Sequence, residues 1–331
     1  MIITQTPLRV SFFGGGTDLP GFFLRHGGAV LSTTIDKYVY IIVKARYDER
    51  IVLNYSEREI VQGVDEIRHG IIRECMKLVG IEKGIEITSI ADVPSRGSGL
   101  GSSSSFTVGL LNALYAYRGD YRSPRDLAET ACRVEIELLG EPIGKQDQYA
   151  AAFGGFQTYE FRADGAVTVT PVAMDATARR ALQGSCFLFY TGQMRKASSV
   201  LEEQKARIEQ TSESLCRMRD IAAGSGRLFS AGDVVEIGRL LNESWKEKKG
   251  LSRGVSSSSL DAWHEKAIAA GAWGGKLLGA GGGGFFLFVA PPEKRQELTR
   301  SLDGLRELEF AFCTTGSRIV FHIDDGVGRI F

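Results

Sequence analysis

The segment at residues 94–105, Pro-Ser-Arg-Gly-Ser-Gly-Leu-Gly-Ser-Ser-Ser-Ser, constrains the fold more than any other part of the sequence. Residues 85–90 before it have strand character, and the apolar run 106–117 after it predicts a helix. The glycines let backbone N–H groups approach an anion, and the positive end of the following helix points to the same place. The segment therefore predicts a phosphate-binding loop. The alternative is a flexible linker, which is not expected between a strand and a helix.

Strand-like and helix-like segments alternate without a strict strand–helix–strand rhythm, which favours an α+β fold over a doubly wound parallel sheet. Alternating or β-branched runs predict strands, whereas apolar residues three or four positions apart predict helices. The predicted strands are residues 9–13, 29–32, 38–43, 85–90, 156–161, 167–172, 186–190 and 285–290. The predicted helices are residues 64–79, 106–117, 123–138, 198–222 and 234–245.

Composition excludes several classes of protein. With 331 residues and 43% hydrophobic content, the chain can bury a core without disulfides, and we expect two lobes with a cleft between them. Forty basic residues balance forty acidic ones, so no net charge attracts nucleic acid or an anionic membrane. The absence of a secretory signal or apolar spanning run predicts a cytoplasmic location. The five cysteines and four histidines form no ligand pattern, so no transition-metal site is expected.

Carboxylates near the middle of the chain are candidates for chemistry. Asp147 follows the break at Pro142, where it could accept the proton of an attacking hydroxyl or serve only as a helix N-cap. Glu135 and Glu137 lie on the preceding predicted helix, and either could ligate Mg²⁺. The alternative for both is a solvated helix face.

Two further glycine-rich segments stand near the ends of the chain. Residues 14–18, Gly-Gly-Gly-Thr-Asp, follow the strand that begins at Arg9, and they suit either a sugar ligand or a hairpin turn. Residues 279–284, Gly-Ala-Gly-Gly-Gly-Gly, precede a predicted strand. Their glycines indicate a backbone crowded against a neighbour, with bound phosphates as one candidate, or only a tight turn.

Taken in order, these segments resemble the GHMP kinase superfamily, which includes galactokinase, homoserine kinase and mevalonate kinase. The resemblance rests on residues 7–18, 94–105 and 279–285. It implies a two-lobed α+β fold with the active site between the lobes. The N-terminal mixed-sheet lobe, residues 1–180, would bind ATP and sugar, and residues 181–331 would form a ferredoxin-like lobe. The implied activity is that of a sugar 1-kinase that uses ATP and Mg²⁺.

The resemblance also implies roles for single residues. Asp147 matches the catalytic aspartate, Arg9 matches the basic residue that pairs with it, and Ser103 and Glu135 match the metal ligands, which implies Glu135 rather than Glu137. The implied ATP contacts are Pro94, Arg96, Gly97, Ser98, Gly99, Leu100, Gly101, Ser102, Ser103 and Ser104. The implied substrate contacts are Gly15, Gly16, Thr17, Asp18, Lys37, Gly144, Arg195, Lys196, Gly282 and Gly283.

Two sequence features indicate the substrate: a difference from galactokinase and a resemblance to another subfamily. Before Thr17 the chain has Gly-Gly-Gly where galactokinase has Gly-Glu-His, which argues against galactose. Residues 190–196, Tyr-Thr-Gly-Gln-Met-Arg-Lys, resemble the heptose 7-phosphate kinase subfamily. That resemblance implies phosphorylation of the anomeric hydroxyl of D-glycero-D-manno-heptose 7-phosphate to the 1,7-bisphosphate, for nucleotide-activated heptose. Arg195 and Lys196, with Lys37 or Arg25, would hold the 7-phosphate, or else form a solvated helix start.

Two other functions remain open from the sequence. One is a kinase for another sugar such as fucose, which would need no second anion site. The other is an inactive relative that binds ATP and sugar as a sensor, although the joint presence of Arg9, Glu135 and Asp147 counts against it. The expected partner is a small sugar phosphate, without nucleic acid or membrane, and a homodimer is left open.

Overall fold

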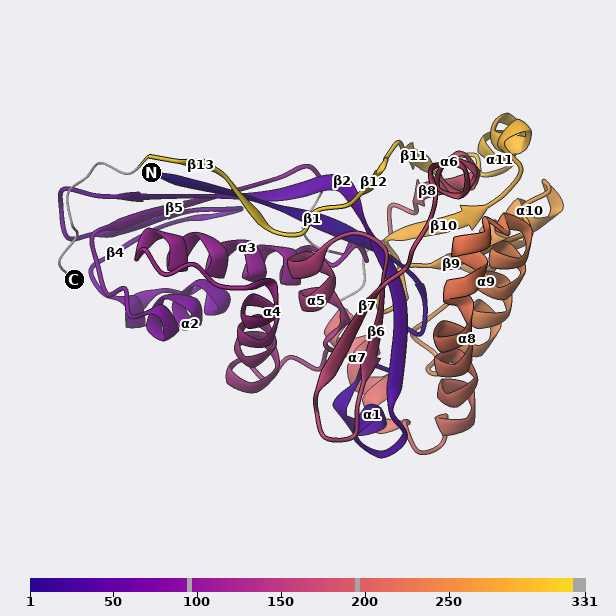
Figure 1. Cartoon of the computed structure of the whole chain (residues 1–331), viewed down its shortest axis with the longest axis horizontal. Coiled ribbons are helices and arrows are strands. Elements are labelled where there is room, and N and C mark those ends of the chain that lie inside the picture. The colour runs from indigo at the N-terminus through magenta and orange to yellow at the C-terminus, as the bar shows by residue number, and fades with distance from the viewer. Residues whose placement is uncertain (94–96, 194–196, 324–331) are drawn as a thin grey trace.

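The computed structural model describes residues 1–93, 97–193 and 197–323, which fold into two lobes (Figure 1). One lobe is built on a nine-stranded sheet and the other on a four-stranded sheet. Helices and strands are interspersed without a regular strand–helix–strand rhythm. The predicted α+β class with two lobes is confirmed.

The nine-stranded sheet is organised around two long antiparallel strands, β1 (Ile2–Phe13) and β2 (Gly28–Ala45). Its other strands are β3 (Ile51–Asn54), β4 (Arg58–Val61), β5 (Ile85–Ala91), β6 (Gln157–Phe161), β7 (Val167–Pro171), β12 (Phe312–Cys313) and β13 (Arg318–His322). The main order is β13-β1-β2-β5-β3-β4. Because β3 and β5 run parallel while their neighbours pair antiparallel, the sheet is mixed.

β2 is one strand of 18 residues, whereas the sequence predicted separate strands at residues 29–32 and 38–43. The intervening Thr33, Thr34 and Ile35 are β-branched and favour extended backbone. The first part of β2 pairs with β6, and the later part pairs with β5. This one strand therefore fixes the two ends of the sheet relative to each other.

Helices cover one face of the nine-stranded sheet (Figure 1). α3 (Ser102–Tyr117) packs on β1 and β2, and it is buried almost all round because its residues are apolar or small. The other helical elements of this lobe are α1 (Pro20–His26), η1 (Val64–Glu66), α2 (Gly70–Val79), α4 (Pro124–Cys132), η2 (Arg133–Leu138) and α5 (Gln146–Phe153).

Two predicted helices are each divided in the structure. Residues 64–79 form a 3₁₀ turn, η1, and then α2, because Glu59 accepts hydrogen bonds from the backbone N–H groups of Arg68 and His69 between them. The helix predicted from residue 123 begins with a capping box and ends its α-helical part at Cys132. It continues as η2, a π-helical turn of the kind that often occurs at functional sites.

The second lobe has the ferredoxin-like strand order. Its strands are β8 (Cys186–Tyr190), β9 (Gly274–Leu277), β10 (Phe285–Val289) and β11 (Arg306–Leu308). They are arranged β11-β8-β10-β9, which confirms the fold predicted for this lobe. α6 (Ala176–Ser185) precedes β8 directly. The other helical elements of this lobe are α7 (Ala197–Ala206), α8 (Ser212–Ala231), α9 (Val234–Lys249), α10 (Ser258–Ala269), η3 (Pro292–Lys294) and α11 (Arg295–Ser301).

The single helix predicted at residues 198–222 is wrong, because α7 and α8 are separate helices. Ile208, in the connection between them, packs with Phe22 of α1 and Leu215 of α8 in a small buried cluster. Burial of these side chains stabilises the turn. The connection thereby ties the second lobe to the segment that follows β1.

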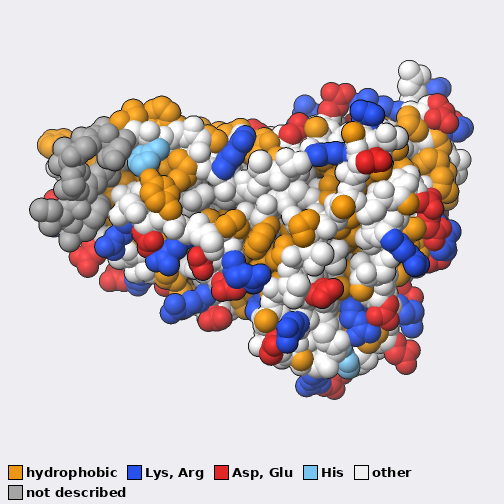
Figure 2. Space-filling model, in the orientation of Figure 1, with side chains coloured by type: hydrophobic (Ala, Val, Ile, Leu, Met, Phe, Trp, Pro, Cys, Tyr) orange, Lys and Arg blue, Asp and Glu red, His pale blue; other side chains and the backbone are white. Residues whose placement is uncertain are grey.

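The last strands return to the first lobe. β12 pairs with β2, and β13 pairs with β1 at the edge of the nine-stranded sheet. A division of the chain at residue 180 stays a prediction, and the strand pairing adds residues 312–322 to the first lobe. Acidic and basic side chains alternate over the face shown in Figure 2, as the balanced composition implies. Within the described ranges, no helix combines the length and apolar character needed to span a membrane.

Two glycine-rich loops cross where the lobes meet. A Cβ atom on Gly99 would lie 2.5 Å from the carbonyl oxygen of Leu278, and one on Gly279 would lie 2.6 Å from the Cα atom of Gly99. The crowding predicted for residues 279–284 is therefore present. Its cause at Gly279 is the backbone of the other loop, where the sequence had suggested bound phosphates.

Substitution Gly99→Ala should destabilise the protein more than Gly119→Ala. Both glycines have a left-handed φ, +73° and +75°, so each alanine carries a backbone penalty of about 1–2 kcal/mol. Nothing lies within 4 Å of a Cβ at Gly119, whereas Gly99 meets Leu278. Overpacking adds about 1–3 kcal/mol at Gly99 alone. Urea unfolding of both variants measures the difference, and equal losses would contradict the contact between the loops.

Candidate active site

A cleft lies between the lobes, and both lobes line it. The first lobe contributes β1, the turn after β1, the loop before α3 and the start of α5, and the second contributes α7, α9 and the glycine loop before β10. The lining residues are Arg9, Gly15, Gly16, Asp18, Leu19, Gly97, Ser98, Gly99, Gly101, Ser102, Ser103, Ser104, Glu135, Glu141, Ile143, Gly144, Gln146, Asp147, Ala197, Ser198, Leu201, Gln204, Lys248, Gly279 and Ala280.

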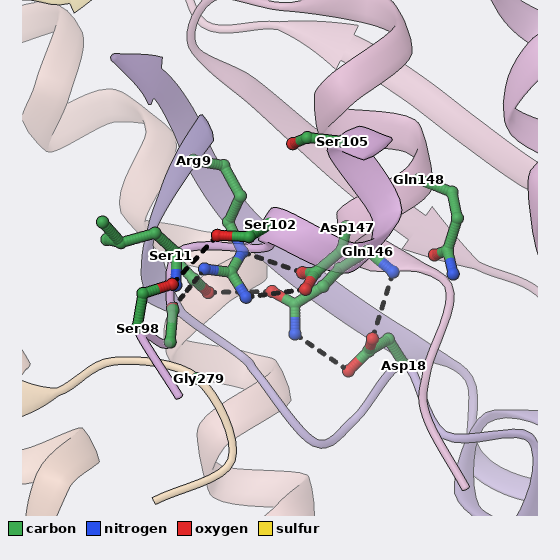
Figure 3. A network of polar contacts seen from close by, with 12 residues as sticks. Arg9, Ser11, Asp18, Ser98, Ser102, Ser105, Gln146, Asp147, Gln148 and Gly279 are labelled. Carbon is green, nitrogen blue, oxygen red and sulfur yellow. Dashed lines mark hydrogen bonds and ion pairs between the residues drawn. The ribbon is translucent and has the colours of Figure 1, made fainter. Parts of the chain in front are cut away.

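The loop before α3 has the geometry of an anion site. Gly97, Gly99 and Gly101 have φ angles of +71°, +73° and +78°, which glycine adopts without strain. α3 begins at the next residue, so the unpaired N–H groups and positive dipole end of this helix face the cleft. Ser98 Oγ and Ser102 Oγ lie 3.0 Å apart beside the loop (Figure 3).

Arg9 and Asp147 form a bidentate salt bridge in the cleft (Figure 3). Arg9 Nε donates to Asp147 Oδ1 and Arg9 Nη2 donates to Asp147 Oδ2, both at 2.8 Å. Arg9 Nη1 also donates to the carbonyl oxygen of Gly99 at 2.5 Å. The arginine, from β1, therefore joins the first turn of α5 to the anion-binding loop. Asp147 remains 23% exposed and can meet a ligand.

Glu135 is buried in the cleft wall next to the start of α3. Its two carboxylate oxygens accept hydrogen bonds of 2.8 Å from Ser103 Oγ and from Gln148 Nε2. Burial raises the pKa of Glu135 to about 7, although the bonds from neighbouring side chains lower it. The π-helical turn η2 carries Glu135 inward, whereas Glu137 of the same turn is exposed. Geometry thus distinguishes two glutamates that the sequence pattern alone left equivalent.

Asp18 lies at the base of the cleft in a network with Gln146 (Figure 3). Its oxygens accept from the backbone N–H groups of Gly16 at 2.9 Å and Gln146 at 3.1 Å. Burial raises the pKa of Asp18, and these N–H bonds partly offset the rise. Gly144 must lack a side chain, because a Cβ there would lie 2.0 Å from Asp18 Oδ2. Ser11 Oγ donates to Gln146 Oε1 at 2.9 Å and holds its amide in place.

Several residues in or near the cleft were not predicted from the sequence, and three of them have polar side chains that matter for the site. Lys248 of α9 and Gln146 line the cleft, and Gln148 is fully buried behind Glu135. A signal existed for Lys248, because it continues the three-and-four spacing of Leu241 and Trp245 on the buried face of α9. Its place in a lysine-rich helix end masked that signal.

Thr17 and Lys37, predicted as substrate contacts, do not line the cleft. The hydroxyl of Thr17 is buried and donates to the carbonyl oxygens of Gly14 and Ala29, at 2.8 and 2.9 Å. Lys37 pairs with the adjacent Asp36 at 3.1 Å, on β2 and away from the cleft. Both side chains already have protein partners.

Other predicted contacts also lie elsewhere. The N–H of Gly282 donates to the carbonyl oxygen of Val255, and Gly283 packs on the backbone of Gln193. Leu100 is buried behind the loop. Arg25 is exposed and pairs with Glu209. Four predicted contacts lie outside the described residues: Pro94, Arg96, Arg195 and Lys196.

A second hollow adjoins the anion-binding loop and shares Ser102 and Ser103 with the cleft. Its other walls include Tyr55, His69 and Phe106, whose rings are in contact. The rings of Tyr55 and His69 meet edge to face with centroids 4.7 Å apart, and those of His69 and Phe106 are tilted by 31° with centroids 5.2 Å apart. An aromatic wall of this kind suits a flat ring. Because the hollow and the cleft share Ser102 and Ser103, the aromatic wall lies beside the anion site.

The fold and this cleft define a two-lobed small-molecule kinase. Family models for the "GHMP kinases N terminal domain" and "GHMP kinases C terminal" match residues 66–155 and 227–305. The chain is 32% identical, over 91% of its length and 93% of the relative, to D-glycero-alpha-D-manno-heptose 7-phosphate kinase of Campylobacter jejuni. The chain belongs to the GHMP kinase family. It is therefore a phosphotransferase that acts on a sugar hydroxyl.

Two further relatives show the range of named activities. A solved structure described as a D-glycero-D-manno-heptose 1-phosphate kinase from Bacteroides thetaiotaomicron superposes with a TM-score of 0.82. It shares 27% identity and covers 98% of this chain and 100% of its own. The L-fucokinase/L-fucose-1-P guanylyltransferase of Bacteroides fragilis is 28% identical over 86% of this chain, but over only 34% of that longer protein.

Substitution Glu135→Gln should remove a pH dependence of stability in the metal-free protein. Burial raises the pKa of Glu135 from 4.5 to about 7, so between these values the folded state keeps a proton that the unfolded state has lost. The free energy of unfolding must therefore fall as pH rises through this window, by about 3 kcal/mol in total.

Urea unfolding at pH 4.5, 6 and 7.5 measures this slope. The exposed Glu137→Gln on the same turn is the matched control and should keep the wild-type slope. Subtracting one variant from the other removes the contributions of the remaining carboxylates. Identical slopes for both variants would refute the assignment to Glu135.

Proposed function

We propose that this kinase transfers the γ-phosphoryl group of ATP to the anomeric hydroxyl of D-glycero-D-manno-heptose 7-phosphate, forming the 1,7-bisphosphate. The observation that carries the proposal is the Arg9–Asp147 salt bridge beside the anion-binding loop. The choice of sugar is supported by the 32% sequence identity between this chain and the heptose 7-phosphate kinase of Campylobacter jejuni. Such a step would belong to the synthesis of nucleotide-activated heptose, and residues 1–180 would bind both substrates.

The nucleotide would bind across the loop before α3. Backbone N–H groups at residues 97–104 would hold the phosphates, because anions are stabilised at a helix N-terminus. The base would enter the adjoining hollow and stack on the aromatic wall that includes Phe106. The shared lining residues Ser102 and Ser103 support a continuous nucleotide site.

Ser103 and Glu135 would hold a magnesium ion. Their oxygens are 2.8 Å apart, and the buried carboxylate has no salt-bridge partner within the described ranges. A hydroxyl and one carboxylate suit Mg²⁺, which keeps substrate phosphates and water as its other ligands. When bound, the ion would offset the negative charge of the phosphates. Gln148 would fix the orientation of Glu135 through its amide.

Three side chains of the cleft would bind the sugar, accept its proton and stabilise the transferred phosphoryl group. Asp18, from the turn after β1, would orient the sugar through its carboxylate. Asp147 would accept the proton of the anomeric hydroxyl as that oxygen bonds to the γ-phosphorus. The bond from the γ-phosphorus to the bridging oxygen breaks at the same stage, so ADP leaves with the bonding electrons, and Asp147 returns its proton to solvent. Arg9 would stabilise negative charge on the transferred group.

The distal 7-phosphate needs its own cation. Arg195 and Lys196 remain the proposed partners, because in the sequence they immediately precede Ala197 and Ser198, which line the cleft. Charge-assisted bonds of this type contribute about 1.5–3 kcal/mol each. Lys37 and Arg25 are less suited to this role, because their ammonium and guanidinium groups form salt bridges with Asp36 and Glu209.

A fucose kinase is the second candidate, and the Bacteroides fragilis relative favours it. An assay of ADP release should compare heptose 7-phosphate, unphosphorylated heptose, L-fucose and D-galactose. We expect kcat/KM for heptose 7-phosphate to exceed that for heptose by about 10²-fold, and Arg195→Ala should remove most of that difference. Faster turnover of L-fucose than of heptose 7-phosphate would transfer the assignment to fucose.

Substitution Asp147→Asn should lower kcat by about 10²- to 10⁴-fold, because the amide cannot accept the hydroxyl proton. Titration with Mg·AMPPNP should show nucleotide affinity within about threefold of wild type, since nucleotide binding does not need a base. The control is Asp220→Asn on the exposed surface of α8, which should leave kcat unchanged. A loss of kcat below about tenfold in Asp147→Asn would remove Asp147 from the proton-accepting role.

A further inference from the structure

We propose that Lys248 is a second cation of the phosphoryl-transfer centre, and that its ammonium group, delivered by α9 of the second lobe, binds an oxygen of the γ-phosphoryl group. This inference rests on the proposed phosphoryl transfer from ATP, but not on the identity of the sugar. It adds a catalytic residue from the second lobe, to which only the partners of the distal sugar phosphate were assigned above.

Lys248 is held deep in the cleft wall. It lines the cleft, yet only 3% of the residue is exposed. Its Nζ donates to the carbonyl oxygen of Gly279, the glycine that packs against Gly99 of the anion-binding loop. The ammonium group therefore lies next to the point where the two glycine loops cross, and this crossing borders the proposed phosphate site.

The charged groups around Lys248 come from four elements. Arg9 lies on β1, Asp18 in the turn after β1, Asp147 on α5 and Lys276 on β9. Both carboxylates already have other partners, since Asp147 pairs with Arg9 and Asp18 accepts N–H bonds. No salt bridge to Lys248 occurs within the described ranges.

Lys248 is thus a buried cation with one carbonyl partner and no anion. A buried charge is costly unless it is paired, so this position is favourable mainly when an anion enters the cleft. Among the described lining residues, the other Lys or Arg is Arg9, which is occupied by Asp147. Lys248 is therefore the cation with donor capacity left for a ligand.

The neighbours of Lys248 indicate which anion it binds. Gly279 contacts Gly99, and Gly99 accepts a bond from Arg9, so ammonium and guanidinium approach the same side of the anion-binding loop. The transferred phosphoryl group must lie between this loop and Asp147 for the hydroxyl to reach it. The distal sugar phosphate would lie farther from the loop, on the other side of the anomeric carbon.

Substitution Lys248→Met keeps the length and apolar stem of the side chain but removes its charge. We expect Mg·AMPPNP, which has a γ-phosphoryl group, to bind about tenfold more weakly, while Mg·ADP affinity stays within twofold. With an acceptor present, kcat should fall about 10²- to 10³-fold. The exposed Lys246→Met on the same helix is the matched control and should match wild type in each measurement.

The pH profile supplies a readout that a packing role would not change. Burial first and then the nearby charge of Arg9 lower the pKa of Lys248, to about 8, although Asp18 and Asp147 act in the opposite direction. In the wild type, kcat/KM should therefore fall as pH rises through about 8, because the free amine carries no charge. This alkaline decrease should be absent in Lys248→Met. In the pH profile of wild-type kcat, the decrease should occur at higher pH than in kcat/KM, because the bound anion favours the ammonium form of Lys248.

Several results would overturn the assignment. Equal weakening of Mg·AMPPNP and Mg·ADP, or an unchanged affinity for Mg·AMPPNP, would show that Lys248 does not contact the γ-phosphoryl group. A raised KM for the sugar phosphate with unchanged kcat would assign Lys248 to the sugar instead. The nucleotide titrations need no acceptor, so they decide this inference even if heptose 7-phosphate is not the substrate.

Discussion

The backbone contact between Gly99 and Gly279 is the constraint on which the cleft depends. Side chains on either residue would separate the loops, because a Cβ on each meets backbone atoms at 2.5–2.6 Å. The anion-binding loop is held from the other side by β1, since the N–H of Arg9 donates to the carbonyl oxygen of Leu100 at 2.9 Å. Contacts from both lobes therefore hold the loop in position before an anion arrives.

Burial of charge in this cleft is tolerable because most of it is paired inside the protein. Arg9 and Asp147 satisfy each other, and Asp18 accepts two backbone N–H groups. Glu135 differs, since its hydrogen bonds come from neutral side chains and burial raises its pKa to about 7. Burial destabilises the ionised form of Glu135, and a bound cation would stabilise that form. The high pKa of Glu135 and the proposed metal site therefore have the same physical cause, which is the burial of this carboxylate.

The sequence predicted those features of the structure that depend on neighbouring residues in the chain. The glycines and serines of the anion-binding loop, followed by an apolar run, were sufficient to predict the loop and α3. The sequence did not predict the direction in which side chains point. The hydroxyl of Thr17 faces the backbone of β2, and Lys37 pairs with Asp36. The partnership of Arg9 and Asp147 spans 138 positions, so family resemblance predicted it where residue patterns could not. The π-helical turn that separates Glu135 from Glu137 leaves no distinct residue pattern.

The described carboxylates that line the cleft all come from one lobe, together with Arg9, and the other lobe adds a second cation. Among the described lining residues, the carboxylates Asp18, Glu135, Glu141 and Asp147 all belong to the first lobe, whereas the second lobe contributes Lys248. Their spacing therefore depends on how the lobes are docked. Lys276 of β9 fixes that docking, because its buried Nζ donates to the carbonyl oxygens of Ser11 and Phe12 on β1, both at 3.0 Å. Lys276, which does not line the cleft, thus helps to set the electric field that a phosphoryl group would enter.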